Sequence, residues 1–148
     1  MTLSPQNNII AKEQKETKMS GTTLLRDPIK YVRDRAKSRY EKGSQCEICG
    51  ATESLDFHHY YTMTPLFNKW CKSKGYAVKV VDDILKIRDE FILEEEDKIY
   101  NQTVTLCHDH HLRLHSVYGK DPALFTADKQ KNWVMIQKEK HETRKLAS

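Results

Sequence analysis

Two short stretches of the chain alternate apolar and polar residues, which is the pattern of a β-strand with one buried face. They cover residues 54–58 and 103–106. Side chains alternate between the two faces of a strand, so His58 and His59 would point in opposite directions if the first strand continues through them. One imidazole can then hold a metal ion while its neighbour does something else.

Apolar residues at helical spacing predict amphipathic helices in four further segments. These segments are residues 27–43, residues 82–97, the residues from Cys107 to His115, and residues 128–141. The first helix would have Asp27 as its N-cap and Pro28 at its first position. Residues 65–76 mix aromatic side chains with Lys and suit either a short helix or a loop. The pattern as a whole predicts a small α+β domain.

Several side chains of these segments are expected to pack in the core. Phe67 and Trp70 follow the usual burial of aromatic residues, and Leu112 and Leu114 would anchor the helix after Cys107. One side of the last helix would carry Trp133, Ile136 and Lys140.

The length and composition indicate one soluble domain with polar extensions. The chain has 148 residues, which suits a single compact domain plus tails. No apolar run approaches the ~20 residues of a membrane span, and residues 1–18 lack the apolar core of a signal peptide. We therefore expect an intracellular protein that is not secreted and does not enter a membrane. Residues 1–23 are polar and are expected to form a flexible arm.

The net charge of +4 is distributed unevenly along the chain. Lys and Arg predominate in residues 1–45 and 111–148, whereas residues 82–98 hold eight acidic against three basic residues. The basic ends suit a DNA backbone, and the acidic segment suits a protein partner or faces away from DNA. Simple solubility is an alternative explanation. The helix predicted over residues 27–43 suits either a DNA contact or a cover over the core.

Four residues have the spacing of a structural zinc site. Cys46 and Cys49 form a Cys-x2-Cys turn followed by Gly50, and Cys107 with His110 forms a Cys-x2-His pair. Two such pairs supply the four soft or borderline ligands that tetrahedral Zn²⁺ prefers. The alternative is a set of buried thiols without metal. Cys71 stands alone and is expected to be a free thiol.

The remaining histidines point to a second ion. His58, His59, His111 and His115 are not needed for zinc, and His111 and His115 lie four residues apart, on one face of a helix. Three imidazoles around a divalent ion with open positions make an electrophilic centre, and a fourth, unligated one can act as a general base.

These motifs in this order resemble the HNH endonuclease family and its ββα-metal (His-Me finger) fold. The similarity rests on the His-His pair, on Asn or Gln, and on Cys-x2-His-His-x3-His, and it covers about residues 46–115. It implies a nuclease domain over residues 24–125 with an insertion at 61–100, followed by a basic helix at 126–148. It also implies an intracellular DNA enzyme of bacterial or phage type.

The resemblance assigns roles to individual residues. His58, His111 and His115 would bind one catalytic ion, Mg²⁺ or another divalent metal, and His59 would take a proton from the attacking water. Asn101 or Gln102 would fill the middle position of the family motif: the family spacing falls on Gln102, whereas a one-residue bulge would present Asn101, which we favour. The implied reaction is hydrolysis of a DNA phosphodiester to 5′-phosphate and 3′-hydroxyl ends.

Two other functions use the same motifs. A zinc module that binds nucleic acid or protein without catalysis accounts for the Cys-rich site and the basic helices, but it leaves four histidines unexplained. A protein with the HNH fold that has become an adaptor keeps the fold and loses the activity. The oligomeric state is not indicated by the sequence.

Overall fold

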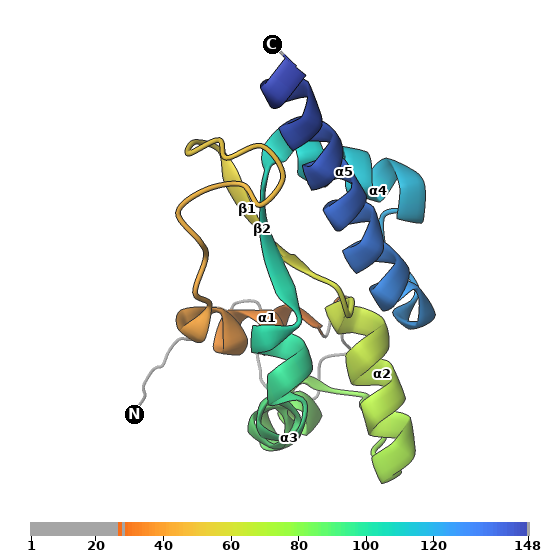
Figure 1. Ribbon diagram of the computed structural model, residues 1–148. Coiled ribbons are helices and arrows are strands. Elements are labelled where there is room, and N and C mark those ends of the chain that lie inside the picture. The colour runs from red at the N-terminus through yellow and green to blue at the C-terminus, as the bar shows by residue number, and fades with distance from the viewer. Residues whose placement is uncertain (1–26, 28, 148) are drawn as a thin grey trace.

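The computed structural model describes residue 27 and residues 29–147. This part of the chain forms a mixed α+β domain built around a two-stranded sheet (Figure 1). Both the expected arm at residues 1–23 and Pro28 lie outside the described residues. The elements in chain order are α1 (Ile29–Ala36), η2 (Lys37–Arg39), β1 (Leu55–His59), α2 (Met63–Lys74), α3 (Val81–Glu94), η3 (Asp97–Asn101), β2 (Thr103–Cys107), α4 (His108–Tyr118), η4 (Leu124–Thr126) and α5 (Ala127–Ala147).

The two predicted strands are confirmed and pair with each other. β1 and β2 run antiparallel, with Leu55 opposite Cys107 and His59 opposite Thr103. β2 leads directly into α4. The start of β1 therefore lies beside the junction of β2 and α4. Figure 1 shows α4 and α5 along one side of this strand pair, with α1, α2 and α3 at one end of it.

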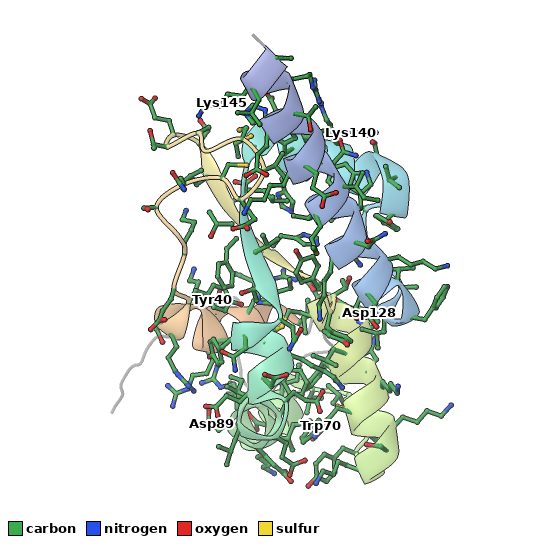
Figure 2. All side chains as sticks on the ribbon, viewed as in Figure 1. Tyr40, Trp70, Asp89, Asp128, Lys140 and Lys145 are labelled. Carbon is green, nitrogen blue, oxygen red and sulfur yellow. The ribbon has the colours of Figure 1, made fainter. Side chains whose placement is uncertain are left out.

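The core consists of two groups of buried side chains. One joins α1, α2 and α3 and includes Phe67, Trp70 and Phe91, which confirms the expected burial of Phe67 and Trp70. Figure 2 shows Trp70 at the end of the molecule where α2 and α3 lie. The other group packs the strands against α4 and α5, with Leu114 fully buried. The expectation for Leu112 is wrong: its side chain is 56% exposed, because it lies two residues from Leu114 on the outer face of α4.

The helix boundaries differ from the sequence expectations at three places. α1 ends at Ala36, before residue 43, and the chain leaves the helix so that the Tyr40 ring stacks on Phe57 at 4.7 Å. Residues 65–76 form most of a helix, α2. α5 reaches Ala147 and buries Gln130 and Val134. Ile136, which the sequence placed on one side of this helix with Trp133 and Lys140, is 39% exposed, and the buried residues of α5 lie on a different stripe.

The acidic segment at residues 82–98 forms ion pairs within the chain. Asp89 accepts a hydrogen bond from Arg35 at 3.0 Å, and Glu96 accepts one from Arg39 at 2.7 Å. Two basic residues of α1 and η2 are thereby used to hold α3 and the residues that follow it. A protein partner for this segment stays a prediction. None of the helices in the described part of the chain is both long and apolar enough to span a lipid bilayer.

Candidate active site and metal centres

The Cys46 turn is built by local backbone bonds and tied to the sheet. The Gly50 N–H donates to the Cys46 carbonyl at 2.9 Å, and the Cys46 N–H donates to the Ala51 carbonyl at 2.8 Å. Gly50 has a φ of 77°, a left-handed conformation that glycine adopts without strain. The Glu47 N–H donates to the Thr105 carbonyl of β2. This last bond brings the turn to the end of β2, where Cys107 lies.

Four ligand atoms converge at this point, and we call them the clasp: Cys46, Cys49, Cys107 and His110. Their ligand atoms all lie within 4.8 Å of one another. The Cys107 Sγ is 3.3 Å from the His110 Nδ1 and 3.9 Å from the Cys49 Sγ. All four cysteines of the chain are free thiols. Three thiols, one more than a disulfide uses, together with an imidazole suit a tetrahedral ion. This cluster could hold a metal ion.

The thiols of the clasp have unlike acidities. Burial opposes ionisation of Cys46, but backbone hydrogen bonds from Cys107, Cys49 and Ile48 outweigh it and lower the pKa of Cys46. Burial, together with a smaller contribution from the neighbouring Cys46, raises the pKa of Cys107 to about 11. A bound cation favours the thiolate form of such a group. The donor set of the clasp therefore fits a metal ion better than a set of neutral thiols.

A second group of ligands, which we call the imidazole cluster, consists of His58 on β1 and His111 and His115 on α4. The His111 Nε2 is 3.1 Å from the His58 Nδ1 and 3.1 Å from the His115 Nε2. Two nitrogens bound to one tetrahedral ion at roughly 2.05 Å would lie about 3.3 Å apart. The cluster faces a cavity of about 200 Å³ that Arg33 and Lys120 also line.

The outer nitrogen of each imidazole has its own acceptor. The His58 Nε2–H donates to the Gln130 Oε1 at 2.7 Å, and the His111 Nδ1–H donates to the Asp56 Oδ2 at 3.0 Å. The His115 Nδ1–H donates to the Gly119 carbonyl at 2.8 Å. These acceptors assign the ring protons to the outer nitrogens, so the three nitrogens that face one another carry lone pairs. Three lone pairs this close repel unless a cation lies between them.

Gln130 and Asp56 are themselves fixed. Gln130 is fully buried on α5, and its Nε2 donates to the Thr126 Oγ1 at 2.9 Å and to the Tyr60 carbonyl. Burial opposes ionisation of Asp56, but hydrogen bonds from His108 and His111 outweigh it and lower its pKa. Burial also lowers the pKa of His58 to about 4, which keeps this imidazole neutral and able to bind a metal ion.

His59 lies on the opposite face of β1 from His58, as the strand pattern predicted. Its ring packs edge-on against Tyr40 and Phe57, at 5.0 and 5.2 Å between ring centroids. Its Nε2 is buried without a hydrogen-bond partner among the described residues, while the backbone of Ile99 bonds the ring. Burial lowers the pKa of His59 to about 4. His59 also lines the cavity of the imidazole cluster.

The two candidates for the middle position of the motif turn away from the imidazoles. The side-chain amides of Asn101 and Gln102 both donate to Asp97, each at 3.1 Å. The Gln102 Oε1 accepts a hydrogen bond from the Lys131 Nζ. Gln102 reaches β1 through its backbone, since its carbonyl accepts from the Tyr60 N–H at 3.1 Å.

Sequence reasoning missed four residues around the imidazole cluster. Strand alternation could have identified Asp56, because it lies two residues before His58 on the same face of a strand. Gln130 is separated from His58 by 72 positions, and Arg33 and Lys120 reach the cavity from α1 and from the loop after α4. No local pattern marks these three residues, because tertiary packing alone brings them to the site.

Comparison with known proteins bears on the identity of this arrangement. No solved structure matches the chain. A family model described as a nicking endonuclease family, and named after phage T5, matches residues 19–144. This span contains both metal-ligand clusters and all five α-helices except the last residues of α5. The chain therefore belongs to this nicking endonuclease family.

Proposed function

We propose that the chain is an HNH-type endonuclease that nicks DNA by metal-dependent hydrolysis of a phosphodiester. Family membership supports endonuclease activity on DNA. The observation that carries the HNH assignment is the convergence of three lone-pair nitrogens from His58, His111 and His115 on one cavity. A strand pair followed by a helix supplies all three, in the order β1, β2, α4, which is the order of a ββα-metal fold.

The clasp would hold a structural Zn²⁺ and the imidazole cluster a catalytic divalent ion such as Mg²⁺. The resemblance to the HNH family places the nuclease unit at residues 24–125, with an insertion at 61–100. The segment at 126–148 is more than an appended basic helix, because Gln130 of α5 hydrogen-bonds His58. The functional unit therefore continues into α5.

The residues around the cavity would have different roles in hydrolysis. An ion bound by the imidazole cluster would supply Lewis-acid stabilisation of charge on the scissile phosphate and on the departing 3′ oxygen. Arg33 and Lys120 line the same cavity and would attract the phosphate. Gln130 and Asp56 hold the rings of His58 and His111 in the orientation that a metal requires.

His59 would accept the proton of the attacking water. Its Nε2 has no hydrogen-bond partner among the described residues, and a lowered pKa leaves the ring neutral at pH 7, so that it carries a lone pair that can accept a proton. Protein atoms cover this nitrogen, so a local rearrangement must expose it before a water molecule can reach it. Attack by that water would leave 5′-phosphate and 3′-hydroxyl ends.

A zinc module without catalysis is the competing function. It accounts for the clasp. It does not account for three imidazoles whose outer nitrogens are each held by a separate acceptor, a set of bonds typical of functional metal sites.

A supercoiled-plasmid assay of the pure protein tests the proposal. We expect conversion to the open-circular form that depends on added Mg²⁺, Mn²⁺ or Ni²⁺. His59→Gln should slow it about 10² to 10⁴-fold, the usual contribution of a general base, with zinc content unchanged. His141→Gln on α5 is the matched control and should cut like the parent. Absence of cleavage with every ion, or full activity of His59→Gln, would contradict the proposal.

A further inference from the structure

A second cavity, of about 300 Å³, runs along one face of α2. The walls include Leu66 and Trp70 of α2, Tyr61 just before it, Lys98, and Leu124 and Phe125 of η4. Three aromatic side chains and two lysines, Lys69 and Lys98, thus face one groove, which we call the α2 groove. None of the catalytic roles assigned above uses these side chains.

The α2 groove adjoins the cavity of the imidazole cluster. Thr62, Met63 and Pro122 line the imidazole cavity, while the groove is lined by Tyr61, one residue before Thr62, and by Leu124, two residues after Pro122. The Thr62 hydroxyl donates to the Pro122 carbonyl at 2.6 Å. This hydrogen bond joins the two segments between the cavities, so a DNA strand held at the imidazole cluster has the groove as its neighbour.

Phe125 is the least expected residue of the groove. Its side chain is 81% exposed, although it sits in a turn whose shape is fixed. The Thr126 N–H and hydroxyl both donate to the Ala123 carbonyl, at 3.0 and 2.6 Å, and Thr126 also accepts from Gln130. A large apolar ring held in solvent by an ordered turn, beside a reaction cavity, suggests a ligand with a flat apolar face.

The charges in and beside the groove favour DNA over a protein segment. The Lys98 Nζ lies 5.2 Å from the centre of the Tyr61 ring, and the Lys131 Nζ lies 5.9 Å from it. Cations among aromatic rings are the combination with which proteins bind single-stranded nucleic acid, where bases stack and phosphates pair with Lys. Glu95 also lines the groove, and a carboxylate there can accept a hydrogen bond from the amino group of a base.

We infer that the α2 groove binds one unstacked base of the DNA strand next to the phosphate that is cut, with the ring of Phe125 stacked on that base. The inference rests on the proposed function, because the cut phosphate is placed at the imidazole cluster. This contact with the base can form only if the base flips out of the duplex or the two strands open beside the nick.

Phe125→Ala tests the inference, with Leu93→Ala as the matched control. Leu93 is a 69% exposed apolar residue on α3, outside the groove. Binding of the parent and both variants to labelled oligonucleotides, each with a single 2-aminopurine at a scanned position, would be measured without added Mg²⁺ or Mn²⁺. We expect Phe125→Ala to lose roughly 5- to 150-fold in affinity, the value of one stacked base. It should also lose a change in 2-aminopurine fluorescence that the parent and Leu93→Ala show at one position.

Three results would overturn the inference: unchanged affinity in Phe125→Ala, an equal loss in Leu93→Ala, or no position-dependent fluorescence change in the parent. Unchanged DNA affinity together with loss of self-association in Phe125→Ala would assign the groove to a protein contact instead. Plasmid nicking by the same samples separates this test from that of the proposed function. If the parent nicks the plasmid but fails the oligonucleotide test, only the inference about the α2 groove is overturned. If the parent never nicks the plasmid, the nuclease assignment is overturned.

Discussion

The clasp and the imidazole cluster lie on the same strand–helix unit, yet their sets of ligands differ in kind and in number. His110 and His111 are consecutive residues of α4, and consecutive side chains on a helix point about 100° apart. His110 joins three thiols, which completes a set of four ligands. His111 joins two imidazoles beside an open cavity. A complete set of four is typical of structural ions, and three ligands with an open position are typical of catalytic ones.

The comparison also shows how one site depends on the other. The clasp connects the Cys46 turn, the end of β2 and the first turn of α4. The imidazole cluster needs β1 and α4 in a fixed relation, because His58 comes from the strand and its partners from the helix. A metal ion in the clasp would therefore fix the helix that carries two of the three proposed catalytic ligands. The predictions below separate the two roles.

Removing a thiol from the clasp should have the largest effect. In Cys49→Ser we expect loss of bound zinc and of the cooperative unfolding transition, because structural zinc contributes directly to folding. Metal analysis and circular dichroism measure this. Cys71→Ala, which removes a free thiol from the core on α2, should keep its zinc and its fold. A folded, zinc-free Cys49→Ser protein would show that the clasp is dispensable.

Removing an imidazole should abolish activity and leave the fold intact. In His115→Ala we expect nicking to fall about a thousandfold, in line with the several kcal/mol that a catalytic ion supplies. The His115 side chain is only partly buried, so the melting temperature should hardly change. Plasmid nicking and calorimetry measure the two quantities. A loss of stability in His115→Ala comparable to that in Cys49→Ser would show that the two sites do not differ in their structural role.

Removing the outer hydrogen bond of His58 should have a smaller effect. Gln130→Met keeps the shape of the side chain but leaves the His58 Nε2–H without its acceptor. We expect the affinity for the exchangeable ion to fall about 10- to 100-fold. Titration calorimetry with Mn²⁺ measures it, and Gln137→Met, two turns along α5, is the control. Equal affinities of parent and Gln130→Met would show that Gln130 does not position the ligand.

The burial of His59 should appear as a small pH effect on stability. The pKa of His59 is about 4 in the folded chain, against an ordinary value of 6.5. Between these values the unfolded chain binds the proton first, so the stabilising contribution of neutral His59 is complete above pH 6.5 and disappears as pH falls towards 4. At pH 5 the loss should be about 2 kcal/mol. Urea unfolding at pH 7 and pH 5 should therefore show a steeper loss for the parent than for His59→Gln, and parallel losses would contradict this.

Short-range geometry explains what the sequence could predict. The Cys-x2-Cys and Cys-x2-His spacings predicted each half of the clasp, because two ligands within one turn converge without help from the rest of the fold. Strand alternation predicted that His58 and His59 would point apart, and helical spacing predicted that His111 and His115 would share a face. Each of these relations is fixed within a few residues.

Long-range packing explains what the sequence could not predict. Gln130 reaches His58 only because α5 packs against α4, and Arg33 reaches the cavity only because α1 lies at the end of the strand pair. Leu112 was placed in the core because it is apolar, although the direction in which α4 packs exposes it. The ends of α1 and α5 depend in the same way on the surfaces against which they pack.

Anomalous diffraction from crystals grown with zinc and then soaked in Mn²⁺ tests the central claim most directly. The account predicts a zinc peak among Cys46, Cys49, Cys107 and His110, and a separate manganese peak among His58, His111 and His115. A single peak at the clasp, with the three imidazoles apart and empty at saturating Mn²⁺, would contradict it.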